Sequence, residues 1–146
     1  MPDNYNLNRF LEAQESTYHT ALSEIRNGRK RSHWMWFIFP QVAGLGFSET
    51  SRFYAIKSKA EAIAYLNHPV LGKRLTEITE ALLTLEGKSA NQIFGSPDDV
   101  KLKSSMTLFN ALSSDNPLFK QVLAKYFKGE KDAKTLQLLN SKAQQL

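Results

Sequence analysis

Cysteine is absent from this 146-residue sequence, and histidine occurs only at positions 19, 33 and 68. Without thiolates the chain can form neither disulfides nor thiolate zinc sites, and a lack of cysteine fits a protein of the reducing cytoplasm. The histidines are too widely separated to form a His-x-x-x-His or Glu-x-x-His pair, the spacings typical of metal ligands. We therefore expect a cytoplasmic protein with no metal site and no bound cofactor.

Long apolar runs are also missing. The longest, residues 34–40, is far shorter than the roughly 20 residues that span a bilayer, and the N-terminal residues MPDNYNLNRF have no apolar signal core. We expect no membrane association. Linkers rich in glycine, proline or serine are absent as well, so the sequence predicts one helical domain over residues 8–140, a flexible tail at 1–7 and a frayed tail at 141–146.

No segment alternates apolar and polar residues convincingly, as half-buried strands do. Helical spacing recurs instead, and it is clearest at Leu71, Leu75, Ile78, Leu82 and Leu85. Residues 32–40 fit either a buried strand or one to two helical turns, and we favour the turns. The predicted helices cover residues 8–26, 59–67, 69–86, 89–94, 98–112, 117–128 and 133–139. The sequence therefore predicts an all-α fold, a compact bundle of six or seven helices.

Two serines mark predicted helix starts. Ser58-Lys-Ala-Glu61 and Ser89-Ala-Asn-Gln92 are capping boxes, in which the serine hydroxyl accepts from the third helical amide. In return, the acid or amide side chain accepts from the serine amide. Other familiar motifs are incomplete: Gly44-Leu45-Gly46 begins like a dinucleotide fingerprint, but Glu49 stands at the third glycine. A tight turn is the better interpretation of the two glycines.

Acidic residues are scarce in one window. Residues 26–59 contain seven Lys or Arg and one acid, Glu49, which gives a net charge of +6 against +5 for the whole chain. Both tryptophans lie in the same window. An ordinary interpretation is that the rings belong to the core and the basic residues to a solvated turn, since a long apolar run is costly to expose. A basic–aromatic segment is also typical of single-stranded nucleic-acid binders.

Two functional hypotheses follow. The first is a pocket, of an enzyme or a binding protein, for an anionic or nucleotide-like small molecule. Its candidate ligand-binding residues are Lys30, His33, Trp34, Trp36, Gln41, Arg52, Tyr54, Lys101 and Ser104. We expect His33, Gln41 and Arg52 to converge above a tryptophan floor, since arginine forks onto phosphate or carboxylate. The second hypothesis is a non-catalytic module that binds protein or nucleic acid through the basic face. The sequence leaves the oligomeric state open.

The window also carries a family resemblance. Residues 28–41, GRKRSHWMWFIFPQ, followed by Gly44-Leu-Gly46, Ser48 and Tyr54, resemble the signature of a bacterial family catalogued as domain of unknown function 1810. Some of its members are labelled calpastatin-like. The resemblance extends to Phe10, Ala13-Gln14, Tyr65-Leu66, residues 68–72, Phe94-Gly95, Asp98, Lys101, Ser104 and residues 106–109. It implies a compact all-helical domain and no established activity, so no catalytic residue follows from it.

Overall fold

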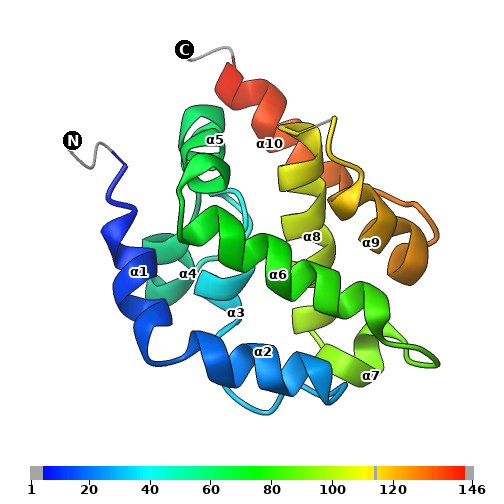
Figure 1. Ribbon diagram of the computed structural model, residues 1–146. Coiled ribbons are helices and arrows are strands. Elements are labelled where there is room, and N and C mark those ends of the chain that lie inside the picture. The colour runs from blue at the N-terminus through cyan, green and yellow to red at the C-terminus, as the bar shows by residue number, and fades with distance from the viewer. Residues whose placement is uncertain (1–4, 114, 144–146) are drawn as a thin grey trace.

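The computed structural model describes residues 5–113 and 115–143, and within these ranges the chain forms ten helices (Figure 1). They are α1 (Asn8–Glu15), α2 (Tyr18–Arg26), α3 (Met35–Ile38), α4 (Glu49–Tyr54), α5 (Lys59–Asn67), α6 (Leu71–Thr84), α7 (Ala90–Phe94), α8 (Asp98–Ala111), α9 (Leu118–Phe127) and α10 (Ala133–Ala143). An isolated bridge between Val42 and Ile56 is the only extended pairing in these ranges. The all-α prediction is confirmed, but six or seven helices was too few.

The helix predicted over residues 8–26 is two helices. α1 ends at Glu15 and α2 begins at Tyr18, and the two residues between them, Ser16 and Thr17, are of types that favour helix ends over helix interiors. The break lets the helices face different neighbours, because α1 packs on α3 whereas α2 packs on α6. Gln14, at the end of α1, is buried and donates to the carbonyl of Phe37 at 2.7 Å. Tertiary contacts therefore divide a continuous apolar stripe.

Two short helices account for more of the difference in number. Residues 35–38 form the predicted helical turn, α3, so the strand interpretation of this segment is wrong. The helix α4 was not predicted, although Ser48 caps it by accepting from the amide of Ser51 at 3.1 Å. A six-residue helix is too short to show a period, which is why only its cap could have indicated it.

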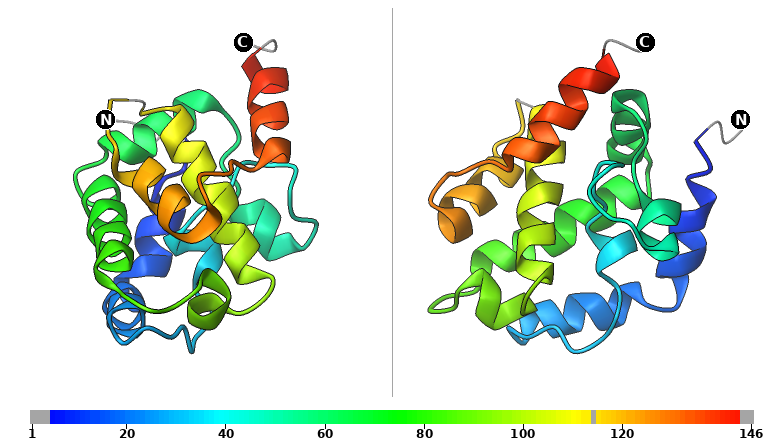
Figure 2. Two further views of the ribbon diagram at one scale, coloured as in Figure 1. Left: turned by 90° about the vertical axis from the view of Figure 1, so that its right-hand side faces the viewer. Right: turned by 180° about the vertical axis from the view of Figure 1, so that it is seen from behind.

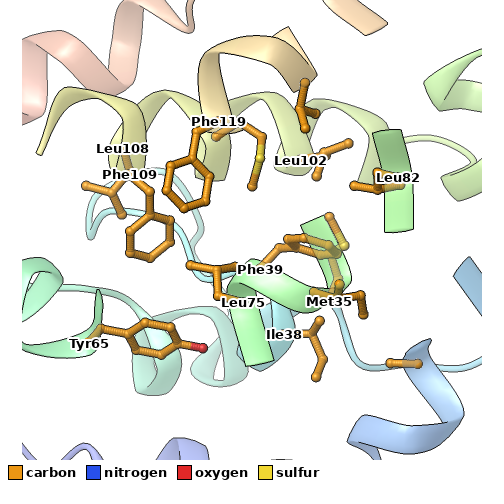
Figure 3. Close-up of a cluster of buried hydrophobic side chains, with 14 of the residues drawn as sticks. Met35, Ile38, Phe39, Tyr65, Leu75, Leu82, Leu102, Leu108, Phe109 and Phe119 are labelled. Carbon is orange, nitrogen blue, oxygen red and sulfur yellow. The ribbon is translucent and has the colours of Figure 1, made fainter. Parts of the chain in front are cut away.

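The core lies between α3, α5, α6, α8 and α9. Figure 3 shows labelled side chains from these helices converging there, among them Met35, Leu75, Leu102 and Phe119. The stripe on α6 faces this core, with Leu71, Leu75, Ile78 and Leu82 all buried. α6 also packs against α2, α5 and α9, so burial of its stripe ties three other helices to the core.

The C-terminal end of α6 is held by α9. The hydroxyl of Tyr126 donates to the carbonyl of Leu82 at 2.5 Å. The ammonium group of Lys125 donates to the carbonyls of Leu83, at 2.8 Å, and Leu85. These carbonyls are the ones that a helix end leaves without intrahelical partners. Side chains of α9 therefore take the place of a capping glycine.

Different helices lie at the two ends of the domain (Figures 1 and 2). α2 and α7 lie at one end, and α10 extends from the body at the opposite end. The loop that joins α2 to α3 runs along the α2 end. Within the described ranges, no helix has both the length and the apolar character needed to cross a membrane.

The two predicted capping boxes have different outcomes. Ser89 and Gln92 form the full reciprocal box at the start of α7, with distances of 3.1 and 2.8 Å. Ser58 accepts from the amide of Glu61 at 3.0 Å, as predicted. The carboxylate of Glu61 does not return to Ser58, because it accepts from the amide of Lys57 and is ion-paired elsewhere. The predicted hydrogen bond from the Ser58 amide to the Glu61 carboxylate is therefore wrong.

Candidate ligand-binding site

A hollow of about 730 Å³ lies where the start of α1, the helix α4 and the start of α5 meet. Its lining residues are Tyr5, Asn6, Arg9, Glu49, Arg52, Phe53, Lys57, Ser58 and Glu61. The volume falls within the roughly 300–1,000 Å³ typical of small-molecule sites. Three kinds of group meet here: a buried ion pair, exposed cations and exposed aromatic rings.

The floor of the hollow is fixed by Arg9, which is buried although it is charged. Its Nε donates to the carbonyl of Phe53 at 2.7 Å, and its Nη1 donates to the carbonyls of Tyr5 and Asn6 at 2.7 and 2.8 Å. Its Nη2 donates to the carbonyl of Ala55 at 3.0 Å and to the Glu61 carboxylate at 2.5 Å. Five acceptors match the five N–H donors of a guanidinium. Arg9 therefore holds the structure together and has no donor left for a ligand.

The other polar groups of the floor are also occupied. One carboxylate oxygen of Glu61 pairs with Arg9, and the other accepts from the amide of Lys57 at 3.0 Å. The hydroxyl of Ser58 accepts from the amide of Glu61 as the cap of α5. Neither side chain is placed as a general base or nucleophile, because each already has a structural role.

The rim differs from the floor because its charges are open to solvent. Arg52 and Lys57 are exposed, and no carboxylate of the described residues lies within ion-pair distance of either. Phe53 and Tyr5 expose 52% and 37% of their surfaces. Large exposed rings beside unneutralised cations are unusual on a plain surface. The rim can therefore receive an anion and a flat apolar group together.

The predicted site residues do not form one pocket. Gln41, Trp36 and Tyr54 line a separate, narrow cavity of about 10 Å³, whereas Arg52 lines the large hollow. His33 is exposed and lines neither. The expected convergence of His33, Gln41 and Arg52 is therefore wrong. Within α4 itself, Tyr54 packs against Phe37 whereas Arg52 is exposed.

Four other predicted residues form a separate cluster around Asp98. Lys30 lies 2.9 Å from the Asp98 carboxylate and 5.1 Å from the ring centre of Trp34. Lys101 lies 3.5 Å from the same carboxylate and 5.3 Å from the ring centre of Trp36. Trp34 itself is fully buried, so its ring belongs to the core, as the first interpretation of the aromatic window holds. Asp98 offsets part of the charge of the two lysines, so this cluster offers less to an anion than two cations without an ion pair do.

Ser104 also has a structural partner. It is buried, and its hydroxyl donates to the carboxylate of Asp132 at 3.0 Å. Asp132 in turn accepts from the amide of Thr135 at 3.1 Å and so caps α10, as its position in the sequence indicates. The contact explains Ser104 without a ligand. Among the described residues, no group of three histidine or acidic side chains could hold a metal ion.

The basic loop after α2 is ordered by Glu24. Its carboxylate accepts from the amides of Arg31 and Ser32 at 2.8 and 3.0 Å, from the Ser32 hydroxyl at 2.6 Å and from the Trp34 indole at 2.9 Å. Burial alone would raise the pKa of Glu24, but these hydrogen bonds outweigh it and hold the pKa below its ordinary value. Glu24 therefore stays ionised and fixes the shape of the loop.

Of the residues that line the hollow, only Arg52 was among the predicted site residues, and the rim residues Tyr5, Glu49, Phe53 and Lys57 were missed. Glu49 and Lys57 were visible only as charges of the basic window. The one signal in the sequence was the N-cap residue Ser48, which predicts a short helix that carries Arg52 and Phe53.

The comparisons agree with this architecture. Residues 4–139 match the model of a family described as protein of unknown function (DUF1810). The chain belongs to the DUF1810 family. The crystal structure of the conserved hypothetical protein Rv1873 from Mycobacterium tuberculosis is 48% identical, covers 94% of this chain and 99% of its own, and superposes with a TM-score of 0.93. No curated protein matches the chain. The DUF1810 assignment thus confirms the resemblance and the all-helical fold, and it brings no activity with it.

Proposed function

We propose that this protein binds a small anionic, nucleotide-like molecule in the hollow between α1, α4 and α5. The observation that carries the proposal is the composition of the rim. Arg52 and Lys57 line the same hollow as the exposed rings of Phe53 and Tyr5, and no carboxylate in the described ranges pairs with either cation. Such a rim supplies both halves of nucleotide recognition, charge for the phosphate and apolar surface for the base.

The roles follow from the chemistry of each group. The guanidinium of Arg52 can form two parallel hydrogen bonds to a phosphate, and Lys57 adds a second positive charge. Phe53 offers a ring face to a nucleobase. Glu49 lines the same hollow without an ion pair among the described residues, and its carboxylate can accept from sugar hydroxyl groups. Because Ser58 and Glu61 are occupied by structural contacts, binding fits this hollow better than catalysis does.

A second hollow, of about 690 Å³, lies along α6 and is a weaker candidate for an anion. Its charged lining residues are Arg26, Lys73, Glu77 and Glu80, so its cations face an equal number of acids. No aromatic ring is among the described residues that line it. Glu77 also accepts a 2.5 Å hydrogen bond from the Tyr18 hydroxyl, which ties it to the structure. This hollow therefore serves as the control in the experiment.

The proposal is tested by thermal denaturation with a ligand panel: adenosine and guanosine monophosphates, adenosine, ribose 5-phosphate and inorganic phosphate. A ligand at one hundred times its Kd stabilises the folded state by about 2.7 kcal/mol, which raises Tm by several degrees. We expect the nucleotides to give the largest shift. Arg52→Ala should remove that shift and leave Tm without ligand unchanged, since the side chain is exposed.

Two variants locate the site. Phe53→Ala should weaken the response to nucleotides more than the response to ribose 5-phosphate, because it removes only the ring. Lys73→Ala, in the second hollow, should leave every response unchanged. A panel with no shift at all contradicts the proposal. So does a shift that survives Arg52→Ala or disappears in Lys73→Ala.

A further inference from the structure

In the loop between α2 and α3, side chains exposed to solvent alternate with side chains that are wholly or partly buried. Arg29, Arg31 and His33 are exposed, whereas the positions between and after them are turned inward. Lys30 keeps 8% of its side chain exposed, Ser32 is half-buried and Trp34 is fully buried. We call the two exposed arginines, Arg29 and Arg31, the cation row.

The inward side chains hold the loop on the domain. Lys30 pairs with Asp98 at the start of α8, and its amide donates to the carbonyl of Ile93 at 2.7 Å. Ser32 and Trp34 both donate to Glu24 of α2. The loop is therefore fixed to α2, α7 and α8, and the cation row has a defined shape before any partner binds. A fixed shape reduces the entropy lost on binding.

The same contacts leave the cation row without neutralising charge. Glu24 and Asp98 are the acids next to the loop, and both are directed at inward groups. Within the described ranges, no carboxylate forms an ion pair with Arg29 or Arg31. The ammonium group of Lys88 lies against the carbonyl of Gly28 at 3.0 Å and adds a further cation at the base of the loop.

We propose that the cation row binds the phosphate backbone of single-stranded nucleic acid. The two arginines are exposed and lie two residues apart on one loop, so the row presents two positive charges close together to a linear polymer that is charged at every unit. Arginine suits phosphate because its planar fork matches two phosphate oxygens. Two arginines this close together contact one strand rather than the two strands of a duplex.

The two tryptophans beside the loop bear on the binding mode. Single-strand binders usually stack bases on exposed aromatic rings. Here Trp34 is in the core, and Trp36 is half-buried with the ammonium group of Lys101 over its ring, so neither ring is an exposed stacking surface. Affinity therefore comes from phosphates, is independent of base sequence and falls steeply with salt.

The test is fluorescence anisotropy of a labelled oligothymidylate of about 20 nucleotides with the full chain, over a series of salt concentrations. Arg29→Ala combined with Arg31→Ala should weaken binding by about tenfold or more at low salt. It should also reduce the slope of log K against log salt by about 1.4, since each phosphate contact on a single strand contributes about 0.7. The anchoring contacts survive, because Arg31 binds Glu24 through its backbone amide.

The matched control removes two charges elsewhere. Lys120 and Lys134, on α9 and α10, are exposed and have no ion pair among the described residues, so Lys120→Ala with Lys134→Ala gives the same net charge. This control should bind almost as tightly as the wild type. The pair Arg29→Lys and Arg31→Lys should keep most of the affinity. If alanine lowers Tm, the corresponding glutamine pair replaces it, with the same loss expected.

Several results would overturn the inference. Equal losses in the loop pair and the control pair would show a general effect of net charge. An acidic peptide that displaces the oligonucleotide as well as an unlabelled strand does would indicate a protein partner, and equally tight binding of a duplex would exclude the single-strand assignment. Arg29→Ala combined with Arg31→Ala should leave the thermal shift produced by nucleotides unchanged, because neither residue lines the nucleotide hollow, so the two sites are tested independently.

Discussion

Arg9 and Glu61 form an ion pair of 2.5 Å in which each side chain keeps only 4% of its surface exposed. The two residues are 52 positions apart, and the pair joins α1 to α5. Because Arg9 also donates to carbonyls before α1 and at the end of α4, one side chain connects three segments of the chain. The hollow beside it owes its shape to this buried connection.

Replacing Arg9 should destabilise the protein strongly. Arg9→Met leaves the Glu61 carboxylate buried without its partner, which typically costs about 3–5 kcal/mol. The free energy of unfolding, measured with urea, gives the loss. In many proteins a buried ion pair can be exchanged for apolar residues at little cost. Here the double variant Arg9→Met with Glu61→Met should stay destabilised, because four carbonyls also lose their donor.

A matched control uses the ion pair between Lys103 and Glu130, in which Glu130 is exposed. Glu130→Gln should change the free energy of unfolding by no more than about 1 kcal/mol. A double variant at Arg9 and Glu61 that recovers wild-type stability would show that the backbone contacts of Arg9 contribute little.

The apolar stripe of α6 provides a second prediction. Leu75 is buried between α6 and the rest of the core, so Leu75→Ala should lower the free energy of unfolding by about 2–5 kcal/mol. Val100, an exposed residue of α8, is the control, and Val100→Ala should have almost no effect. A loss below half of 1 kcal/mol at Leu75 would contradict the packing described for α6.

The third prediction concerns the serine that caps the start of α5. Ser58→Ala removes the hydroxyl that accepts from the amide of Glu61, and loss of such a cap typically costs about 0.5–2 kcal/mol. Ser58→Asp should retain most of the stability, since aspartate also caps helices. Urea denaturation of the two variants measures the difference. An alanine variant with an unchanged midpoint and slope would show that this cap contributes nothing.

The fourth prediction concerns pH and Glu24. Its pKa in the folded protein lies below the ordinary value of 4.5, so the ionised carboxylate stabilises the fold above that pH, and the stabilisation is lost as the pH falls through the lowered pKa. At neutral pH, Glu24→Gln should lower stability by about 1–3 kcal/mol, because a carboxylate that accepts four hydrogen bonds is replaced by an amide with one accepting oxygen.

The difference between wild type and this variant should be constant from pH 7 down to roughly 5, and it should then shrink as acid protonates the wild-type side chain. Thermal denaturation over that range measures it. A difference that grows on acidification would mean that Glu24 is protonated in the folded protein at neutral pH, contrary to the hydrogen bonds described.

The helices that the sequence predicted well carry local signals. α5 begins after a serine cap, and α6 repeats its apolar residues at spacings of three and four. Both helices can therefore be recognised from the sequence without knowing the fold. The break between α1 and α2 carries no such signal. It depends on α1 facing α3 while α2 faces α6, which is a tertiary relationship.

The candidate site was harder to predict for a related reason. Arg52 was recognised as a candidate, but its neighbours were not, because Tyr5 and Phe53 are brought together by Arg9. In the sequence, Arg9 looks like an ordinary exposed charge on an amphipathic helix. Its burial becomes understandable only when the carbonyls around it are known.

The alternation of residues 29–34 also constrains the length of the loop. Arg29 and Arg31 could each be exchanged without disturbing the anchors at Glu24 and Asp98. Inserting or deleting one residue between Gly28 and Ser32 would instead reverse which side chains face inward, directing an arginine toward Asp98 and a lysine toward solvent. In this segment the number of residues is a stricter requirement than their identity.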